Sequence, residues 1–297
     1  MRRTLTVVFG AVLALALGCG GSGTPERTRT EAEVASVPAG PHAGATTSAD
    51  GIRIAYTTTG TGAPAIVFIH CWCGDQTFWK EQVPEFSRDH QVVTIDLPGH
   101  GESGSGRKQW ALAAFGEDVK RVVEQLGLDQ VVLVGHSMGG PIALEAAAAM
   151  PERVVMVVGV DTLHDVEEKP DPKEWKTLLD KLEADFAGTC REFVGSMFPR
   201  DAAPGLVTGV QDSVCDENPE VGRAVMAGFA SFDAAAAMAR VSAPVRCIQG
   251  SMFPTNIEGN RRHAHDFDAV VVPGTGHFPH MEKPAEFNRL LRQVLGS

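Results

Sequence analysis

The sequence predicts an α/β fold: a mostly parallel sheet with helices on both faces and an inserted helical cap. Short apolar runs alternate with helical stretches over most of the chain, as in parallel β-α-β units. A Gly-x-Ser-x-Gly turn joins one apolar run directly to a helix. Residues 163–238 interrupt the alternation with prolines, short helical patches and no buried strand, which is typical of an insertion. Right-handed crossovers between the remaining strands would give a single sheet.

The strands and helices are expected in the following order. Residues 50–56 alternate in polarity after a turn signal, as a hairpin strand does. Continuous apolar runs, typical of strands covered on both faces, lie at 65–69, 91–95, 131–134, 154–160, 245–249 and 269–272. Helical stretches lie at 78–86, 113–126, 138–150 and 285–295.

The first 48 residues are expected to lie outside the fold. Residues 1–18 join a positive start to an apolar stretch too short to span a bilayer, as in a signal peptide. Cys19 and the Gly/Ser-rich residues after it resemble the lipobox of bacterial lipoproteins, with residues 19–48 as a flexible tether. We therefore expect export to the cell envelope, with a lipid on Cys19 as the only membrane attachment. Plain secretion is the alternative, and the paired arginines leave twin-arginine export open.

Composition argues against several classes of function. An apolar content of 43% and a charged content of 21% describe an ordinary globular protein. A net charge of −11 argues against nucleic-acid binding and against docking on anionic lipid through a basic patch. The ten histidines lack the spacing of a zinc site, so neither a metal ion nor another cofactor is expected. The expected partner is a small molecule bound by a monomer.

Ser137 is the candidate nucleophile. The strand Val131–Val134 runs into Gly135-His-Ser-Met-Gly139, and an alanine-rich helix follows, which is the context that a nucleophile elbow requires. Glycines at 135 and 139 allow the strand and helix backbones to approach closely. The turn would hold Ser137 in a strained conformation, with its hydroxyl exposed beside the helix N-terminus.

Four motifs in order resemble the α/β-hydrolase family, of the capped serine esterase and lipase type, over residues 50–297. They are Ile69-His-Cys-Trp72, Asp96-Leu-Pro-Gly-His-Gly-Glu-Ser103, Gly135-His-Ser-Met-Gly-Gly140 and Gly276-His-Phe-Pro-His-Met-Glu-Lys-Pro284. The resemblance implies an eight-stranded sheet, with a core formed by 49–162 and 239–297 and a cap at 163–238. Because this fold hosts many reactions, function has to be argued from the site.

A base and an acid should accompany the serine, whose hydroxyl is a poor nucleophile by itself. His277 matches the position of the family's catalytic histidine, on a glycine-containing loop after the last strand. The turn after Gly250, where most relatives carry the acid, has no carboxylate except Glu258 further on. Asp161 ends the strand after the nucleophile helix, an alternative acid site that haloalkane dehalogenases use. We favour Asp161 and keep Glu258 second, with a simple turn aspartate as the alternative.

The oxyanion hole is expected from two backbone N–H groups. Met138 follows the nucleophile and supplies one of them. The resemblance assigns the other to Trp72, although Cys71 stands where relatives usually have glycine. Four further histidines are expected to support loops or structure rather than transfer protons: His70, His100, His136 and His280.

The cysteines indicate one disulfide in an exported protein. Cys190 and Cys215 both lie in the insertion, where a cross-link would compensate for a small core. Cys71 and Cys73 are too close in sequence for an unstrained bridge in extended backbone. Cys247 lies in an apolar strand and is expected to be a core residue.

These features predict a serine hydrolase that cleaves a carboxylic ester through an acyl-enzyme. Alternative enzyme functions would apply the same triad to a lactone, to a carbon–carbon bond or to perhydrolysis. A serine at 137 argues against dehalogenase and epoxide-hydrolase chemistry, which needs a carboxylate nucleophile. A catalytically silent protein that binds a ligand under the cap is the alternative from a different class.

Overall fold

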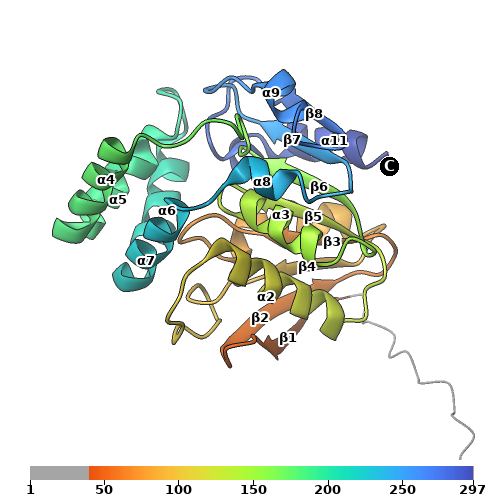
Figure 1. The fold of residues 1–297 in the computed structure, drawn as a ribbon. Coiled ribbons are helices and arrows are strands. Elements are labelled where there is room, and N and C mark those ends of the chain that lie inside the picture. Colours follow the sequence, from red (N-terminus) through yellow and green to blue (C-terminus); the bar gives the residue numbers. More distant parts are fainter. Residues whose placement is uncertain (1–39, 297) are drawn as a thin grey trace, which may run out of the picture. The chain divides into compact units, whose positions relative to one another are not determined.

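An eight-stranded sheet runs through the computed structural model, which describes residues 40–296 of the chain (Figure 1). Its strand order is β1-β2-β4-β3-β5-β6-β7-β8, and only β2 runs antiparallel to its neighbours. The strands are β1 (His42–Thr47), β2 (Arg53–Thr59), β3 (Ala65–Ile69), β4 (Val92–Ile95), β5 (Val131–His136), β6 (Val154–Val160), β7 (Val245–Gln249) and β8 (Phe267–Val271). The predicted fold class, including the mostly parallel sheet, is confirmed.

Helices cover both faces of the sheet because alternate strand residues point to opposite sides. Val67 and Ile69 of β3 join one apolar core with α2 (Leu112–Gln125) and α3 (Gly139–Ala149). Ile66 and Phe68 join a second core. That core contains residues of the 3₁₀ helix η1 (Gln76–Trp79), α1 (Val83–Phe86) and α11 (Pro284–Leu295). The central strands are therefore buried on both sides, as their continuous apolar runs predict.

Two elements differ from the prediction. Residues 42–47, expected in the tether, form β1, which pairs with β2 at the edge of the sheet. This strand is largely exposed and is held by its backbone hydrogen bonds to β2, so it needs no large apolar side chains. The single helix expected at 78–86 is divided into η1 and α1. Pro84 explains the break, because proline lacks the N–H of a helix interior and is tolerated only in the first turn.

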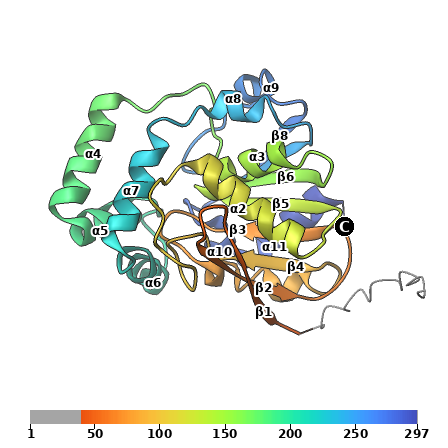
Figure 2. The ribbon, with the colours of Figure 1, turned by 60° about the horizontal axis from the view of Figure 1, so that its bottom comes forward.

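The insertion folds as four helices that gather beside the core (Figures 1 and 2). They are α4 (Pro172–Ala184), α5 (Phe186–Ser196), α6 (Pro204–Cys215) and α7 (Pro219–Phe229). Three of them begin with proline, so the prolines of this region start helices. A disulfide joins Cys190 of α5 to Cys215 of α6, which confirms the expected pair.

The predicted cap boundary at 238 extends too far. A short helix, α8 (Ala234–Met238), packs against α3 of the core, and Ala237 and Met238 are buried there. Its two buried apolar residues explain this placement, because they add to the core on that face of the sheet.

The predicted signal peptide (1–18), Cys19 and most of the tether lie outside the described residues. No helix between residues 40 and 296 is long and apolar enough to cross a membrane.

Candidate active site

The loops after β3, β5 and β6 lie together at the carboxyl ends of these parallel strands, where the strand order reverses. β3 pairs with β4 on one side and with β5 on the other, so the chain leaves β3 in one direction and returns on its opposite side. The crevice at such a switch point, at the carboxyl ends of parallel strands, is where open α/β sheets bind ligands. The fold therefore places the predicted site residues at this edge.

Ser137 occupies the turn between β5 and α3 with a φ of +52°, in the left-handed region. A side chain on Gly135 would collide with the carbonyl oxygen of Gly139, and one on Gly139 would collide with the carbonyl oxygen of Ile69. Thr162 Oγ1 donates a 2.9 Å hydrogen bond to the Ser137 carbonyl and helps to hold the strained turn. The turn is thus built as the glycine pattern predicts, and it keeps the serine side chain half-buried.

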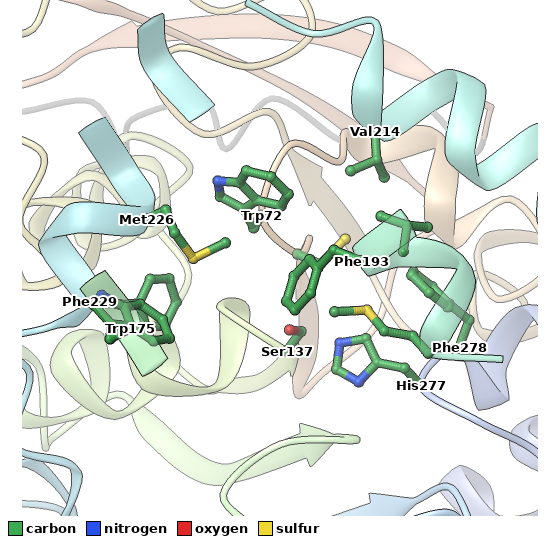
Figure 3. Close-up of a pocket in the computed structure, with 12 residues that line it drawn as sticks. Trp72, Ser137, Trp175, Phe193, Val214, Met226, Phe229, His277 and Phe278 are labelled. Atoms are coloured by element: carbon green, nitrogen blue, oxygen red, sulfur yellow. The ribbon is translucent and has the colours of Figure 1, made fainter. Parts of the chain in front are cut away.

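His277 lies beside Ser137 and contacts Asp161 directly. Its Nδ1 is 2.6 Å from Asp161 Oδ2, the distance of a charge-assisted hydrogen bond. His136, the residue before the serine, donates from Nε2 to the His277 carbonyl at 2.7 Å. Ser137 and His277 line the same cavity, and the imidazole lies next to the serine hydroxyl in Figure 3. The structure therefore brings residues 137, 161 and 277 together.

The Asp161 carboxylate is buried, with 3% of the residue exposed. Its second oxygen, Oδ1, accepts a 2.7 Å bond from the Gly250 N–H. Burial alone would raise the pKa of this carboxyl, but hydrogen bonds and positive charge from His164 and His277 outweigh it and lower the pKa below its usual value. Asp161 is thus held ionised in the position needed to orient an imidazole.

Glu258 is placed elsewhere. It lies in the first turn of α9 (Ile257–Arg261), where its exposed carboxylate pairs with Arg261 at 2.9 Å. The loop after β7, which carries no acid near Gly250, instead supplies the Gly250 N–H to Asp161. Of the two candidate acids, the structure brings only Asp161 to His277.

The two predicted oxyanion donors lie beside the serine. Trp72 lines the cavity with Ser137, and Met138 stands at the N-terminus of α3. Within residues 40–296 neither backbone N–H donates a hydrogen bond to another group of the chain, so both are available to a ligand. The Trp72 indole N–H donates to the carbonyl of Gly222 in α7, which joins the loop after β3 to the cap. Cys71 fits at the glycine position with its side chain buried.

The cavity above Ser137 is apolar and has a volume of about 160 Å³. The core and the cap both contribute to its wall. Among residues 40–296 the titratable groups that line it are His277 and the Cys71 thiol. Burial raises the pKa of that thiol to about 12, so it stays neutral. The cap supplies Trp175, Phe193, Val194, Met197, Val214, Met226 and Phe229, and Figure 3 shows the side chains around the serine.

The histidines expected to support the structure are buried; His70 bonds neighbouring backbone, whereas His280 packs against other rings. His70 accepts from the Leu97 N–H through Nε2 and donates from Nδ1 to the Cys71 carbonyl. His280 packs between Trp79 and His136, with ring centroids 4.6 and 4.5 Å away. Burial lowers the pKa of His280 to about 3 and also lowers that of His136, so both remain neutral beside His277.

One supporting residue was missed by sequence reasoning. The Glu282 carboxylate accepts hydrogen bonds from the N–H groups of Gly276 and Phe278, at 2.9–3.1 Å. These are the residues on either side of His277, so one side chain fixes the loop that carries the imidazole. The signal was its place in the Gly276–Pro284 motif, six residues after Gly276.

The fold and site define a protein with the α/β-hydrolase fold. A family model described as the alpha/beta hydrolase fold matches residues 64–206. The dihydrolipoyllysine-residue acetyltransferase component of the acetoin cleaving system of Cupriavidus necator is 26% identical over 260 residues, which are 83% of this chain and 67% of that protein. Epoxide hydrolase 4 of Homo sapiens is 30% identical over 143 residues, 47% of this chain and 40% of that protein.

Among solved structures, a thermophilic esterase from Thermogutta terrifontis superposes with a TM-score of 0.75 at 24% identity. The superposition covers 86% of this chain and 98% of that one. At this level of identity the likeness concerns the fold, so the reaction has to be argued from the site.

Proposed function

We propose that this protein is a serine hydrolase that cleaves carboxylic esters through an acyl-enzyme intermediate. The observation that carries the proposal is the His277–Asp161 pair, which meets Ser137 at the floor of an apolar cavity. A nucleophile, a base and an orienting acid in this arrangement are the geometric signature of nucleophilic acyl transfer.

The steps follow from the geometry. His277 Nε2 takes the proton of the Ser137 hydroxyl as Oγ attacks the ester carbonyl carbon. The Nδ1–H bond to Asp161 fixes the tautomer and stabilises the imidazolium. The N–H groups of Trp72 and Met138 bind the oxyanion. The carbon–oxygen bond then breaks, and His277 returns its proton to the leaving alkoxide. Water activated by His277 attacks the acyl-enzyme and releases the acid.

The cavity indicates the substrate class. An apolar cavity of about 150 Å³ holds a molecule the size of benzene, and the cavity here has about 160 Å³. Its wall offers aromatic and thioether side chains and no charged partner for a carboxylate or an amine. We therefore expect uncharged esters with short aliphatic or small aromatic groups, and poor turnover of charged or long-chain esters.

A fluorophosphonate probe tests the proposal directly. It should label the wild-type protein and leave Ser137→Ala unlabelled, and short-chain p-nitrophenyl esters should be hydrolysed only by the wild type. A folded wild-type protein that is neither labelled nor active would support the silent binding protein instead. The closeness of residues 137, 161 and 277 would then be structural.

We propose in addition that the chain is exported and anchored through a lipid on Cys19, as its N-terminal sequence indicates. Metabolic labelling with a radioactive fatty acid should mark the full-length protein, and Cys19→Ser should remove the label and release the protein from membranes. Equal release of both forms would favour plain secretion.

A further inference from the structure

A second histidine reaches the Asp161 carboxylate from the side opposite His277. Nε2 of His164 lies 3.5 Å from Asp161 Oδ1, whereas His277 binds Oδ2. Two left-handed residues make this approach possible: Asp161 has a φ of +42° and Leu163 has a φ of +54°. Neither residue is glycine, and such conformations cost free energy that the surrounding structure has to offset. The strained turn after β6 therefore folds the chain back over its own carboxylate.

The loop after β7 orients the His164 ring and backbone. Thr255 Oγ1 lies 3.3 Å from Nδ1, so the hydroxyl can donate to Nδ1 and leave the ring proton on Nε2, facing Asp161. The Asn256 N–H donates to the His164 carbonyl at 2.7 Å. Among the described residues Nε2 makes no hydrogen bond, and the carboxylate oxygen facing it at 3.5 Å is Asp161 Oδ1. The site thus has an oriented donor whose nearest acceptor is the proposed triad acid.

We propose that His164 is a positioning residue of the triad, acting through Asp161. The inference rests on the proposed function. Gly250 and His164 share Oδ1, so Oδ2 remains turned toward His277. The loop after β7 thereby supports an acid on the neighbouring strand: it provides the Gly250 N–H and, through Thr255, the orientation of His164.

His164 also affects the charge balance at the imidazole. Other charged groups near it are Asp165 and Glu168, which line the same surface hollow on its own segment; Asp165 accepts a bond from Asn256. The loop at 250–256 carries no charged side chain. An N–H group 3.5 Å from Oδ1 reduces the negative potential of the carboxylate that His277 contacts through Oδ2. Removing His164 should therefore stabilise the His277 imidazolium and shift the loss of activity to higher pH.

The test compares His164→Ala and His164→Gln with the wild type, using the full chain and a short-chain ester. Gln places an amide N–H where Nε2 lies, so it should retain most of kcat. Ala should lower kcat about three- to tenfold with little change in KM, because the N–H group that faces Asp161 Oδ1 at 3.5 Å is lost. The pH of half-maximal kcat/KM on the acid side should rise in Ala. His265→Gln, at an exposed histidine, is the matched control.

A second pair guards against misfolding of the Ala variant: Thr255→Val should act in the same direction, and Thr255→Ser should behave as the wild type. The low-field NMR proton between His277 and Asp161, assigned by its loss in Asp161→Asn, gives a readout independent of turnover and should shift in His164→Ala. The inference is overturned if the wild type is active and His164→Ala has the same kcat, the same pH of half-maximal kcat/KM on the acid side and the same low-field proton resonance. A wild type without activity or probe labelling would instead reject the proposed function.

Discussion

Asp161→Asn is the substitution whose effect the structure determines most sharply. The carboxylate accepts from His277 on Oδ2 and from the Gly250 N–H on Oδ1. Asparagine keeps the shape but has one oxygen and one NH₂ group. The Gly250 donor is a backbone N–H with a fixed direction, so the amide oxygen of the introduced asparagine will face that N–H. The NH₂ group then faces Nδ1 of His277 and requires that nitrogen to be an acceptor.

That arrangement places the imidazole proton on Nε2, where it prevents His277 from accepting the serine proton. In serine-protease triads the same exchange lowers kcat by about 10⁴-fold. We expect a loss of about 10³–10⁴-fold here, which corresponds to about 4–5 kcal/mol of activation free energy at 1.36 kcal/mol per tenfold. KM and thermal stability should change little, since the Gly250 bond and the packing are retained.

Hydrolysis of a short-chain p-nitrophenyl ester measures the loss, with the melting temperature as a check on folding. Glu258→Gln is the matched control, because this carboxylate is exposed and pairs with Arg261. It should remain within about twofold of the wild type, as expected for an exposed ion pair. If Asp161→Asn retained a tenth of kcat, or if Glu258→Gln lost as much, Asp161 would not be the acid and the tautomer argument would fail.

Two more predictions follow from the supporting contacts. Glu282→Gln removes acceptor capacity from the N–H groups that flank His277, so we expect a loss of about 1–2 kcal/mol of stability and a lower kcat. Glu286→Gln, at a half-buried glutamate that pairs with Arg289, is its control in thermal melts, and equal melting temperatures would contradict the role. The Cys190–Cys215 disulfide closes a separation of 25 residues, which the chain-entropy model values at about 3.5 kcal/mol. Dithiothreitol should lower the melting temperature of the wild type but not of the Cys190→Ser/Cys215→Ser variant, and an equal response in both would refute it.

The elements that were predicted correctly are those whose own residues show a clear pattern of apolar side chains or glycines. The central strands are continuous apolar runs. Gly135 and Gly139 indicate a tight turn, because a Cβ at either position would collide with backbone. β1 was missed for the opposite reason, because an exposed edge strand is held by its ladder and carries no hydrophobic pattern. The division at Pro84 was available from the sequence, since proline in a helix interior is unfavourable.

The placement of Ser137 and His277 in one cavity was predictable, because each stands in a motif with a fixed place in the fold. Contacts between loops were not predictable. His164 meets Asp161 only because residues 161 and 163 adopt left-handed backbone, which no pattern of side chains at these positions signals. Gly250 donates to Asp161 because the loops of two strands meet, and a single sequence shows neither loop's path.

The position of the proposed acid, Asp161, has a simple explanation in the sheet. β6 and β7 are parallel neighbours, with Val160 opposite Ile248, and the Asp161 N–H donates to the Ile248 carbonyl. Adjacent strands lie about 4.8 Å apart, so a carboxylate that leaves the end of either strand can reach the same imidazole. Moving the acid from the β7 loop to β6 therefore needs no change in the sheet or in the His277 loop. It does need a hydrogen-bond donor from the loop after β7 to hold the carboxylate. The Gly250 N–H is that donor, 2.7 Å from Asp161 Oδ1.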